Sequence, residues 1–522
     1  MRVTHEVFNQ PPPLTGHDVA ADPALLDALP SANHAMLHDL GRRAGESEVQ
    51  RWAEEANAYP PRLRTHDRFG NRVDEVDFHP AWHHLMRVAV EAGLAGADQD
   101  QRTRAAGLYV WSQVEAGHTC PISMTYAIIP ALRHEPDLAA RYEPLLTSRI
   151  YDPGLRPPLS KHGLLAGMGM TEKQGGSDVR ANTTTATRHG DHWLLRGHKW
   201  FTSAPMCDLF LVLAQAPRGL SCFLVPRVLP GGDRNVFRIQ RLKDKLGNRS
   251  NASSEPEFDD TVAWLVGEEG RGVRTIIEMV AMTRLDCVIG SAAGMRAALT
   301  QAIHHARHRA AFGRLLVDQP LMTSVLADLA LETEAATTLM MRLAGSAEPL
   351  RRLAIAAGKF WVCKRQPAVV GEALECLGGN GYVEESGLPR LYRDAPLNSI
   401  WEGAGNVQAL DVLRTLRREP DSAAAFVDEV SLAAGADRRL DEAVAGLKTL
   451  LTDPREDQAR RVAERMALVL QGSLLVRHAP GFVADAFCAT RLGGDHGGSF
   501  GTLPPGVDTA AIVARALPGT DG

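Results

Sequence analysis

The hydrophobic and polar positions along the chain divide it into regions with different periods. Across residues 23–156, apolar residues recur at spacings of three and four, most clearly over 48–58 and 80–94. This spacing predicts helices. Between about residues 163 and 267 the segments become short and rich in Thr, Val, Phe and Trp, and after Gly270 the helical period returns over longer stretches. The pattern therefore predicts helices, then a sheet, then helices again.

The middle region contains the predicted strands. Thr183, Thr185 and Thr187 alternate along one segment, and His189 and Gly190 begin a turn, which is typical of a hairpin. Five or more strands without helices between them favour an antiparallel sandwich or barrel over βαβ units. The predicted strands cover residues 182–188, 192–202, 209–215, 221–226, 236–242 and 255–259.

The third region has the pattern of a four-helix bundle. A long helix is predicted from about Val273 through residue 306, and three more follow with apolar stripes over 322–329, 350–377 and 407–416. Long helices with short connections form bundles. Beyond Arg418 we expect two further helical stretches, 442–451 and 458–476, and then a Gly/Pro-rich, loosely ordered tail from Gly493.

Composition and charge limit the classes of protein. The chain has 522 residues, 44% of them hydrophobic and 23% charged, with a formal net charge of -5. Such a balance gives no overall attraction to nucleic acid or anionic lipid. Seven scattered cysteines form no CxxC pair, which favours reduced thiols in the cytoplasm. We find no secretory signal and no run of 18 apolar residues, so we expect no membrane association.

Several common motifs are absent from the sequence. It contains no GxGxxG opening a helix, no P-loop and no HExxH. One G-x-S-x-G string, at 497–501, lies in the Gly-rich tail without the strand-to-helix context of a nucleophile elbow. Histidines 79, 83, 84, 304 and 308 are not accompanied by Cys or carboxylates at ligand spacing, so we predict no metal site.

Two segments of the sheet region combine residues suited to a flat aromatic ligand. MTEKQGGSD (170–178) offers small side chains and backbone N–H groups, although such a sequence is also an ordinary turn. GHKWFTS (197–203) offers Trp200 for stacking and Thr202 as a hydrogen-bond donor, although a strand Trp is usually a core residue.

Two segments of the helical region carry further candidate chemistry. RAAFG (309–313) holds an arginine that could pair with a pyrophosphate or simply be solvated. LGGNGY (377–382) is a tight turn, and SIWEGAGN (399–406) places Glu402 just before the last bundle helix. Asn406 is predicted to be the N-cap of that helix, whose N–H groups could face a phosphate.

Taken together in this order, the segments resemble the acyl-CoA dehydrogenase family over residues 163–414. The resemblance implies FAD as cofactor, with Trp200 and Thr202 against the flavin and Arg309 reaching the FAD pyrophosphate of a neighbouring subunit. It implies Glu402 as catalytic base. The cofactor-binding residues that it implies are Met170, Thr171, Gly176, Ser177, Trp200, Thr202, Arg309, Phe312, Gln319, Glu375, Gly378, Gly379, Ala404 and Asn406.

Phrases such as FNQPPPL, MTEKQGGSDV and NSIWEGAGNVQALDVLR are similar to the AidB-like branch of that family, whose members are alkylation-response flavoproteins resembling isovaleryl-CoA dehydrogenase. This implies a mostly α fold with a central antiparallel β-barrel. The implied parts are an N-terminal helical domain (1–162), a β-barrel (163–268), a four-helix bundle (269–418) and a helical C-terminal extension (419–522). A homotetramer and an association with double-stranded DNA are also implied.

The sequence departs from the general family pattern near the predicted base. Glu375 replaces a Gln, Ala404 and Asn406 replace a Thr and a Gln, and Trp401 replaces a Tyr. We expect Arg284, Trp401 and Arg414 to shape the acyl pocket and to make it smaller and more charged than usual.

Two functions are consistent with these features. The first is FAD-dependent α,β-dehydrogenation of a short or branched acyl-CoA, with electron-transfer flavoprotein or another acceptor. The alternative is a DNA-binding flavoprotein that protects DNA from alkylation. Residues 421–522 carry four more acidic than basic residues, so DNA would need arginines gathered in space, with the following as candidates: Arg455, Arg460, Arg461 and Arg465.

Overall fold

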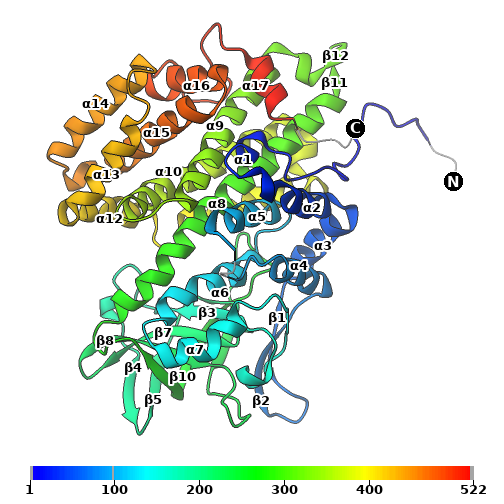
Figure 1. Cartoon of the computed structure of the whole chain (residues 1–522). Helices are drawn as coiled ribbons and strands as arrows, with labels where there is room; N and C mark the ends of the chain where they lie inside the picture. The colour runs from blue at the N-terminus through cyan, green and yellow to red at the C-terminus, as the bar shows by residue number, and fades with distance from the viewer. Residues whose placement is uncertain (1–3, 97–98, 518–522) are drawn as a thin grey trace. The chain divides into compact units, whose positions relative to one another are not determined.

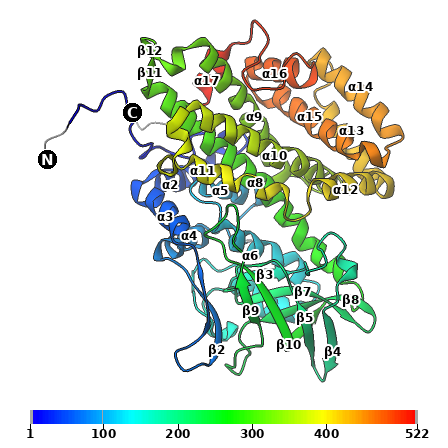
Figure 2. The same cartoon turned by 180° about the vertical axis from the view of Figure 1, so that it is seen from behind.

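The computed structural model describes residues 4–96 and 99–517 (Figures 1 and 2). It contains two compact units. The first comprises Met1–Gln50, Tyr109–Val114 and Cys287–Gly522, and the second comprises Arg51–Leu108 and Glu115–Asp286. None of the helices within the described ranges is long and apolar enough to cross a membrane.

The second unit begins with helices and a two-stranded hairpin. Its helices are the greater part of α3 (Ser47–Ala58) and α5 (Gln101–Ser112), with α4 (Pro80–Glu91), α6 (Thr119–Leu132) and α7 (Pro136–Leu146).

The hairpin pairs β1 (Arg62–His66) with β2 (Arg72–Asp77). The sequence analysis predicts only helices in this region. The spacing of apolar residues does not reveal the hairpin, because both strands are rich in charged residues. A turn fixes it instead, in which Asp67 accepts hydrogen bonds from the Phe69 and Asn71 amides at 2.8 and 2.9 Å.

The predicted barrel is confirmed as a closed β-barrel sheet in the second unit (Figure 1). Its ring runs β7–β8–β10–β5–β4 and returns to β7. The strands are β3 (Ala166–Gly169), β4 (Thr185–His189), β5 (His192–His198), β6 (Thr202–Ser203), β7 (Leu209–Ala216), β8 (Gly219–Pro226), β9 (Arg238–Leu242) and β10 (Ser253–Val266).

The sheet differs from the prediction in two details. It is not wholly antiparallel, because β7 pairs in parallel with β3 and, at one position, with β4. The expected strand 192–202 is divided into β5 and β6. Strand β7 is buried over the consecutive residues 209–214. A strand covered on both faces reads as a continuous apolar run, which is why its position was predictable.

The four predicted bundle helices are confirmed (Figure 2). They are α8 (Gly272–His308), α9 (Pro320–Ala344), α10 (Leu350–Cys376) and α12 (Gly405–Arg418). All but the first 15 residues of α8 belong to the first unit, which also contains α1 (Pro23–Leu26), α2 (His34–Gly45) and α11 (Leu388–Asp394). Helices α9 and α10 approach closely at Gly358, where a β-carbon would lie 2.8 Å from Leu343 Cδ1.

The C-terminal extension contains more helix than the two predicted stretches. Its helices are α13 (Pro420–Ser431), α14 (Arg438–Thr452), α15 (Ala459–His478), α16 (Gly481–Phe487) and α17 (Thr509–Arg515).

The expectation of a loosely ordered tail is wrong for residues 493–517, and the rest of the predicted tail lies outside the described residues. The Gly501 amide donates to Asp328 at 2.9 Å, and Arg515 of α17 donates to Glu334 of α9 at 3.0 Å. Tertiary ion pairs order a segment whose Gly and Pro content suggested disorder.

Candidate functional site

Two of the predicted segments meet in the second unit. The Trp200 amide donates to the Thr171 carbonyl at 2.8 Å, and Lys199 Nζ donates to Glu172 Oε1 at 2.7 Å with both side chains fully buried. At Gly176, a β-carbon would lie 2.5 Å from Thr171 Oγ1. The turn 170–178 therefore lies directly against the strand segment that carries Trp200.

Glu172 fixes the shape of this turn. Its carboxylate accepts hydrogen bonds from the Thr183 and Thr184 amides at 2.7 and 3.1 Å. Burial alone would raise the pKa of Glu172, but the charge of Lys199 and these hydrogen bonds hold that pKa well below its usual range. Burial in turn lowers the pKa of Lys199 to about 8, against the opposing effect of Glu172. The two predicted segments contain one of these residues each, but only the structure shows that they form a buried pair.

Thr202 offers a buried group without a partner among the described residues. Its side chain is 1% exposed, it lies on β6, and its Oγ1 makes no hydrogen bond. A buried hydroxyl without a partner costs free energy, so such a group is usually satisfied by a ligand or water. This hydroxyl is therefore a candidate contact for a bound ligand.

Three cations surround the Trp200 ring. Lys243 Nζ lies 3.2 Å from the ring centroid, while Arg241 and Lys173 lie 5.6 and 5.8 Å away. Glu255 holds Lys243 at 2.6 Å. The contribution of Arg241 and Lys243 was not predicted, because these residues are distant in sequence from the segments 170–178 and 197–203, whereas Lys173 lies within the first of them. All three cations also pair with carboxylates, Lys243 and Arg241 with Glu255 and Lys173 with Glu257.

Two further residues of the turn, Met170 and Ser177, were predicted to bind the cofactor. Met170 accepts a hydrogen bond from Asn182 Nδ2 at 2.9 Å through its carbonyl, and Ser177 is exposed.

In the first unit, β11 (Ala310–Ala311) and β12 (Arg314–Leu315) form a small hairpin, with Arg309 just before it and Phe312 in its turn. Phe312 has φ of 51° and is fully exposed. Arg309 Nη1 donates to the Asn9 carbonyl at 2.6 Å, and Asn9 also bonds both polar backbone groups of Ala310. Gln319 donates to the Ala311 carbonyl at 2.9 Å. The N-terminal segment and Gln319 therefore hold this hairpin.

The predicted Gly-Gly turn is a 3₁₀ helix, η5 (Gly378–Tyr382). Gly378 has φ of 59°, which favours glycine. Gly379 and Glu375, the latter in the last turn of α10, are exposed.

Glu402 stands in the left-handed backbone region. Its φ is 57° and that of Gly403 is 100°. A non-glycine residue in this conformation is strained, and such residues cluster at functional sites. Gln408 Nε2 donates to the carbonyls of both residues at 3.0 Å. The loop is therefore held in an unfavourable conformation by its surroundings.

The predicted helix cap after this loop is wrong. Helix α12 begins at Gly405 with Ala404 as N-cap, and no side chain caps it. Asn406 lies in the first turn, where Arg460 Nη1 contacts its Oδ1 at 3.5 Å. The two glycines around Ala404 let the chain enter the helix two residues earlier than the Asn suggested.

The three predicted pocket residues are distributed between the units. Trp401 donates through Nε1 to Asn398 Oδ1 at 2.9 Å, and Arg414 donates to Asp411 at 3.1 Å, both within the first unit. Arg284 is half-buried on the part of α8 that belongs to the second unit.

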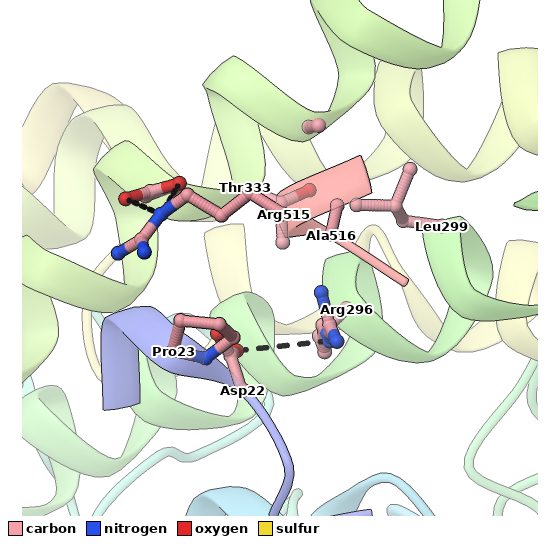
Figure 3. Close-up of a pocket in the computed structure, with 9 residues that line it drawn as sticks. Asp22, Pro23, Arg296, Leu299, Thr333, Arg515 and Ala516 are labelled. Carbon is pink, nitrogen blue, oxygen red and sulfur yellow. Dashed lines mark hydrogen bonds and ion pairs between the residues drawn. The ribbon is translucent and has the colours of Figure 1, made fainter. Parts of the chain in front are cut away.

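The first unit also contains a small charged pocket, which is lined by residues of α1, α8, α9 and α17 or next to them (Figure 3). This pocket was not predicted from the sequence. Asp22 lies 3.7 Å from Arg296 and accepts from Tyr109 at 2.6 Å, and Arg515 pairs with Glu334. Its two acids and two arginines balance, which is consistent with a structural role. The described residues contain no cluster of three His, Cys, Asp or Glu that could hold a metal.

Two of the arginines considered for DNA already have contacts. Arg455 forms an ion pair with Asp457 at 2.7 Å, and Arg460 contacts Asn406 and the ring of Phe360. Arg461 is exposed and Arg465 is half-buried. The structure adds no observation that favours a DNA-binding face here.

Comparisons with known sequences cover nearly the whole chain. Residues 9–153 match the adaptive response protein AidB N-terminal domain, 167–261 the acyl-CoA dehydrogenase middle domain, and 270–417 the acyl-CoA dehydrogenase C-terminal domain. AidB of Escherichia coli (strain K12) is 46% identical over 94% of each chain. Acyl-CoA dehydrogenase family member 11 of Caenorhabditis elegans is 30% identical over 90% of this chain and 86% of its own.

A solved structure of the same Caenorhabditis elegans relative has a similar fold. ACDH-11 of Caenorhabditis elegans, solved in complex with C11-CoA, superposes with a TM-score of 0.83 at 29% identity over 94% of both chains.

The barrel, the bundle and these matches show that the chain belongs to the acyl-CoA dehydrogenase family. Within that family its N-terminal part is of the AidB type. It is therefore an FAD-dependent oxidoreductase of the acyl-CoA dehydrogenase type.

Proposed function

We propose that the protein dehydrogenates a short or branched acyl-CoA between its α and β carbons, with Glu402 as the base that removes the α-proton. The observation that carries this proposal is the strained backbone of Glu402, at φ of 57° and held by Gln408. Strain of this kind persists only where the surrounding structure imposes it, and a base must be held in position to act.

The reaction requires the chain mainly to hold the reacting groups in position. A thioester α-proton is weakly acidic, so its removal requires a positioned base and donors near the carbonyl where negative charge develops. A bound FAD would supply the acceptor for the hydride that leaves the β-carbon. Glu402 takes the proton, and the chain's other residues orient the acyl group and exclude water.

We propose that the residues implied by the resemblance hold FAD. In the second unit, the Thr202 hydroxyl has an unused hydrogen-bonding group, and Trp200 provides a ring for stacking. In the first unit, Arg309 and η5 take part, and we propose that Arg309 serves a flavin bound to a neighbouring subunit. The complete proposed set is Met170, Thr171, Gly176, Ser177, Trp200, Thr202, Arg309, Phe312, Gln319, Glu375, Gly378, Gly379, Ala404 and Asn406.

The acyl pocket is proposed to include Arg284, Trp401 and Arg414. Replacing a Tyr by the larger Trp401 removes space, which supports a short or branched acyl chain. The Caenorhabditis elegans relative was solved with C11-CoA, so a substrate screen needs medium chains as well as branched ones.

We further propose a homotetramer that transfers electrons to electron-transfer flavoprotein or another acceptor in the cytoplasm. The fully exposed Phe312 beside Arg309 supports burial by a second copy of the chain. The seven cysteines are buried free thiols, which supports a reducing compartment.

Binding to double-stranded DNA is not favoured by the charge of the C-terminal extension or by its paired arginines. A gel shift with duplex DNA over a range of salt concentrations tests it. Salt-dependent binding at low ionic strength would revive the alternative.

The proposed base is tested with Glu402→Gln. We expect the variant to retain FAD and its yellow spectrum but to lose bleaching of the flavin by a short branched acyl-CoA. Glu385→Gln, which changes an exposed carboxylate of the same unit, is the control and should bleach normally. Normal bleaching by Glu402→Gln would contradict the assignment.

A further inference from the structure

Lys359 of α10 is a buried cation that contacts the loop carrying Glu402. It is 1% exposed, and its Nζ donates to the carbonyls of Asn398, Trp401 and Gly403 at 3.0, 2.9 and 3.0 Å. An ammonium group has three donors. All three are therefore directed at the backbone on both sides of Glu402.

The energetic cost of this arrangement indicates a specific role. Burying a charge is unfavourable unless it is hydrogen-bonded, and hydrogen bonds from a charged donor are stronger than neutral ones. No ion pair to Lys359 occurs within the described part of the chain, so backbone carbonyls alone stabilise its charge. No neutral side chain carries three hydrogen-bond donors on one atom that point in three directions. This explains why a lysine occupies the position.

Other contacts hold the same loop. Asn398 donates to Ser291 Oγ at 3.2 Å and accepts from the Trp401 indole at 2.9 Å. Gln408 donates to the carbonyls of Glu402 and Gly403. Lys359 joins both ends of this network, because its ammonium group contacts residues 398, 401 and 403 at once.

The helix beneath Lys359 is itself fixed. The preceding residue, Gly358, is the position of close approach between α10 and α9, where any β-carbon would meet Leu343. Lys359 therefore extends from a part of α10 that packs closely against α9.

We propose that Lys359 is the positioning residue of the catalytic loop, and that its three hydrogen bonds keep Glu402 in the left-handed conformation required for proton removal. The inference rests on the proposed role of Glu402. It adds a residue outside the segments 170–178, 197–203, 309–313, 377–382 and 399–406, and it assigns this residue no contact with substrate or flavin.

The test compares Lys359→Met with Lys161→Met. Lys161 is a matched buried lysine of the second unit, which donates to the Gly154 carbonyl at 3.0 Å and to Asp208 at 2.7 Å. Methionine keeps the length of the side chain and removes the ammonium. The measurements are flavin reduction by a short branched acyl-CoA in a single turnover, steady-state kcat and KM, and amide hydrogen exchange over residues 398–405.

We expect Lys359→Met to lower kcat and the reduction rate by about a hundredfold, since small misplacements of a reacting group cost rates of that order, with KM changed by less than about twofold. Exchange over 398–405 should rise in this variant only. Lys161→Met should leave both unchanged. If Lys359→Met does not fold, Gln408→Leu, which removes the other donor to this loop, should show the same effects in weaker form.

The outcomes separate this inference from the proposed function. If Glu402→Gln abolishes turnover but Lys359→Met leaves kcat or the exchange over 398–405 unchanged, the positioning role is overturned while the base assignment stands. If Glu402→Gln keeps full turnover, the base assignment fails and with it the catalytic part of this inference. Loss of kcat with raised exchange in Lys359→Met supports it.

Discussion

At the scale of single residues, the chain uses buried polar groups in two ways. Lys199 and Glu172 satisfy each other and join the turn 170–178 to the strand segment beside it. Thr202, by contrast, is buried with its hydroxyl unsatisfied by any described residue. A satisfied group contributes to stability, whereas an unsatisfied one indicates where a ligand is expected.

Thr202→Val should therefore weaken FAD binding with little loss of stability. Valine has nearly the same shape and removes a hydroxyl that has no partner among the described residues, so the free energy of unfolding of the apoprotein should fall by less than about 1 kcal/mol or rise. The FAD dissociation constant should increase by about fivefold to tenfold, corresponding to one lost hydrogen bond. Flavin titration by fluorescence measures this, and unchanged affinity would argue against the contact.

Glu172→Gln should behave in the opposite way. It leaves the buried Lys199 charge without its counter-ion, and breaking a buried pair costs about 3–5 kcal/mol. We expect a lower unfolding midpoint in urea. Glu257→Gln serves as the comparison. It removes the carboxylate that pairs with Lys173 at the surface and should cost less than about 1 kcal/mol.

At the scale of elements, the loop before α12 contains two residues in the left-handed backbone region, Glu402 and Gly403. The backbone of this loop also lies close to neighbouring side chains. A β-carbon on Gly403 would lie 2.7 Å from Gln408 Nε2 and 3.0 Å from Val407 Cγ1. Both the conformation and the space therefore require glycine at this position.

Gly403→Ala should destabilise the protein by about 1–3 kcal/mol and reduce turnover, because it adds strain directly beside Glu402. Gly387→Ala is a matched control, since Gly387 also has a positive φ, of 74°, but has open space around it. It should cost only the conformational part, about 1 kcal/mol, and leave turnover intact. Equal effects of the two substitutions on kcat would show that the loop is not sensitive to its local packing.

The elements also show what could be predicted. The apolar stripes of α8, α9, α10 and α12 are long, so their existence followed from periodicity. The charged hairpin β1–β2 and the short helix α17 could not be found in this way. Tertiary contacts such as that of Arg515 with Glu334 stabilise α17, and no local pattern encodes them. The proposed division into four domains stays a prediction.

At the scale of the whole chain, an acid-sensitive junction connects the C-terminal extension to the bundle within the first unit. Glu429 of α13 accepts from Arg342 of α9 at 2.6 Å and from Arg477 of α15 at 2.8 Å. The hydrogen bond from Arg342, with that from Arg477, lowers the pKa of Glu429 from 4.5 to about 2.

A lowered folded-state pKa contributes stability above the unfolded value and loses it as the carboxylate is protonated. The contribution of Glu429 should thus be complete above pH 4.5 and disappear as the pH falls toward about 2. The free energy of unfolding of Glu429→Gln should decline less than that of the wild-type protein across this window. Asp428→Asn, which alters an exposed neighbour, should follow the wild-type curve.

The proposed tetramer places a further prediction at this scale. Phe312→Ser should shift the protein to smaller species in light scattering and reduce its FAD content, because Phe312 is fully exposed beside Arg309 in the single chain. A tetramer with full flavin content in this variant would contradict an interface at the hairpin. Leu432→Ser, which changes an apolar residue that is also exposed but lies in the C-terminal extension, is the control.

The order of helices, barrel and bundle, and the family, could be predicted from the residues alone, because apolar periodicity and short motifs are local properties of the chain. It also identified Glu402 as a candidate and placed Trp200 and Thr202 in one segment. Only the tertiary structure revealed the left-handed backbone of Glu402, the buried Lys199–Glu172 pair and the three carbonyls around Lys359. These features join residues up to 44 positions apart, and such contacts depend on how the elements pack rather than on any local pattern.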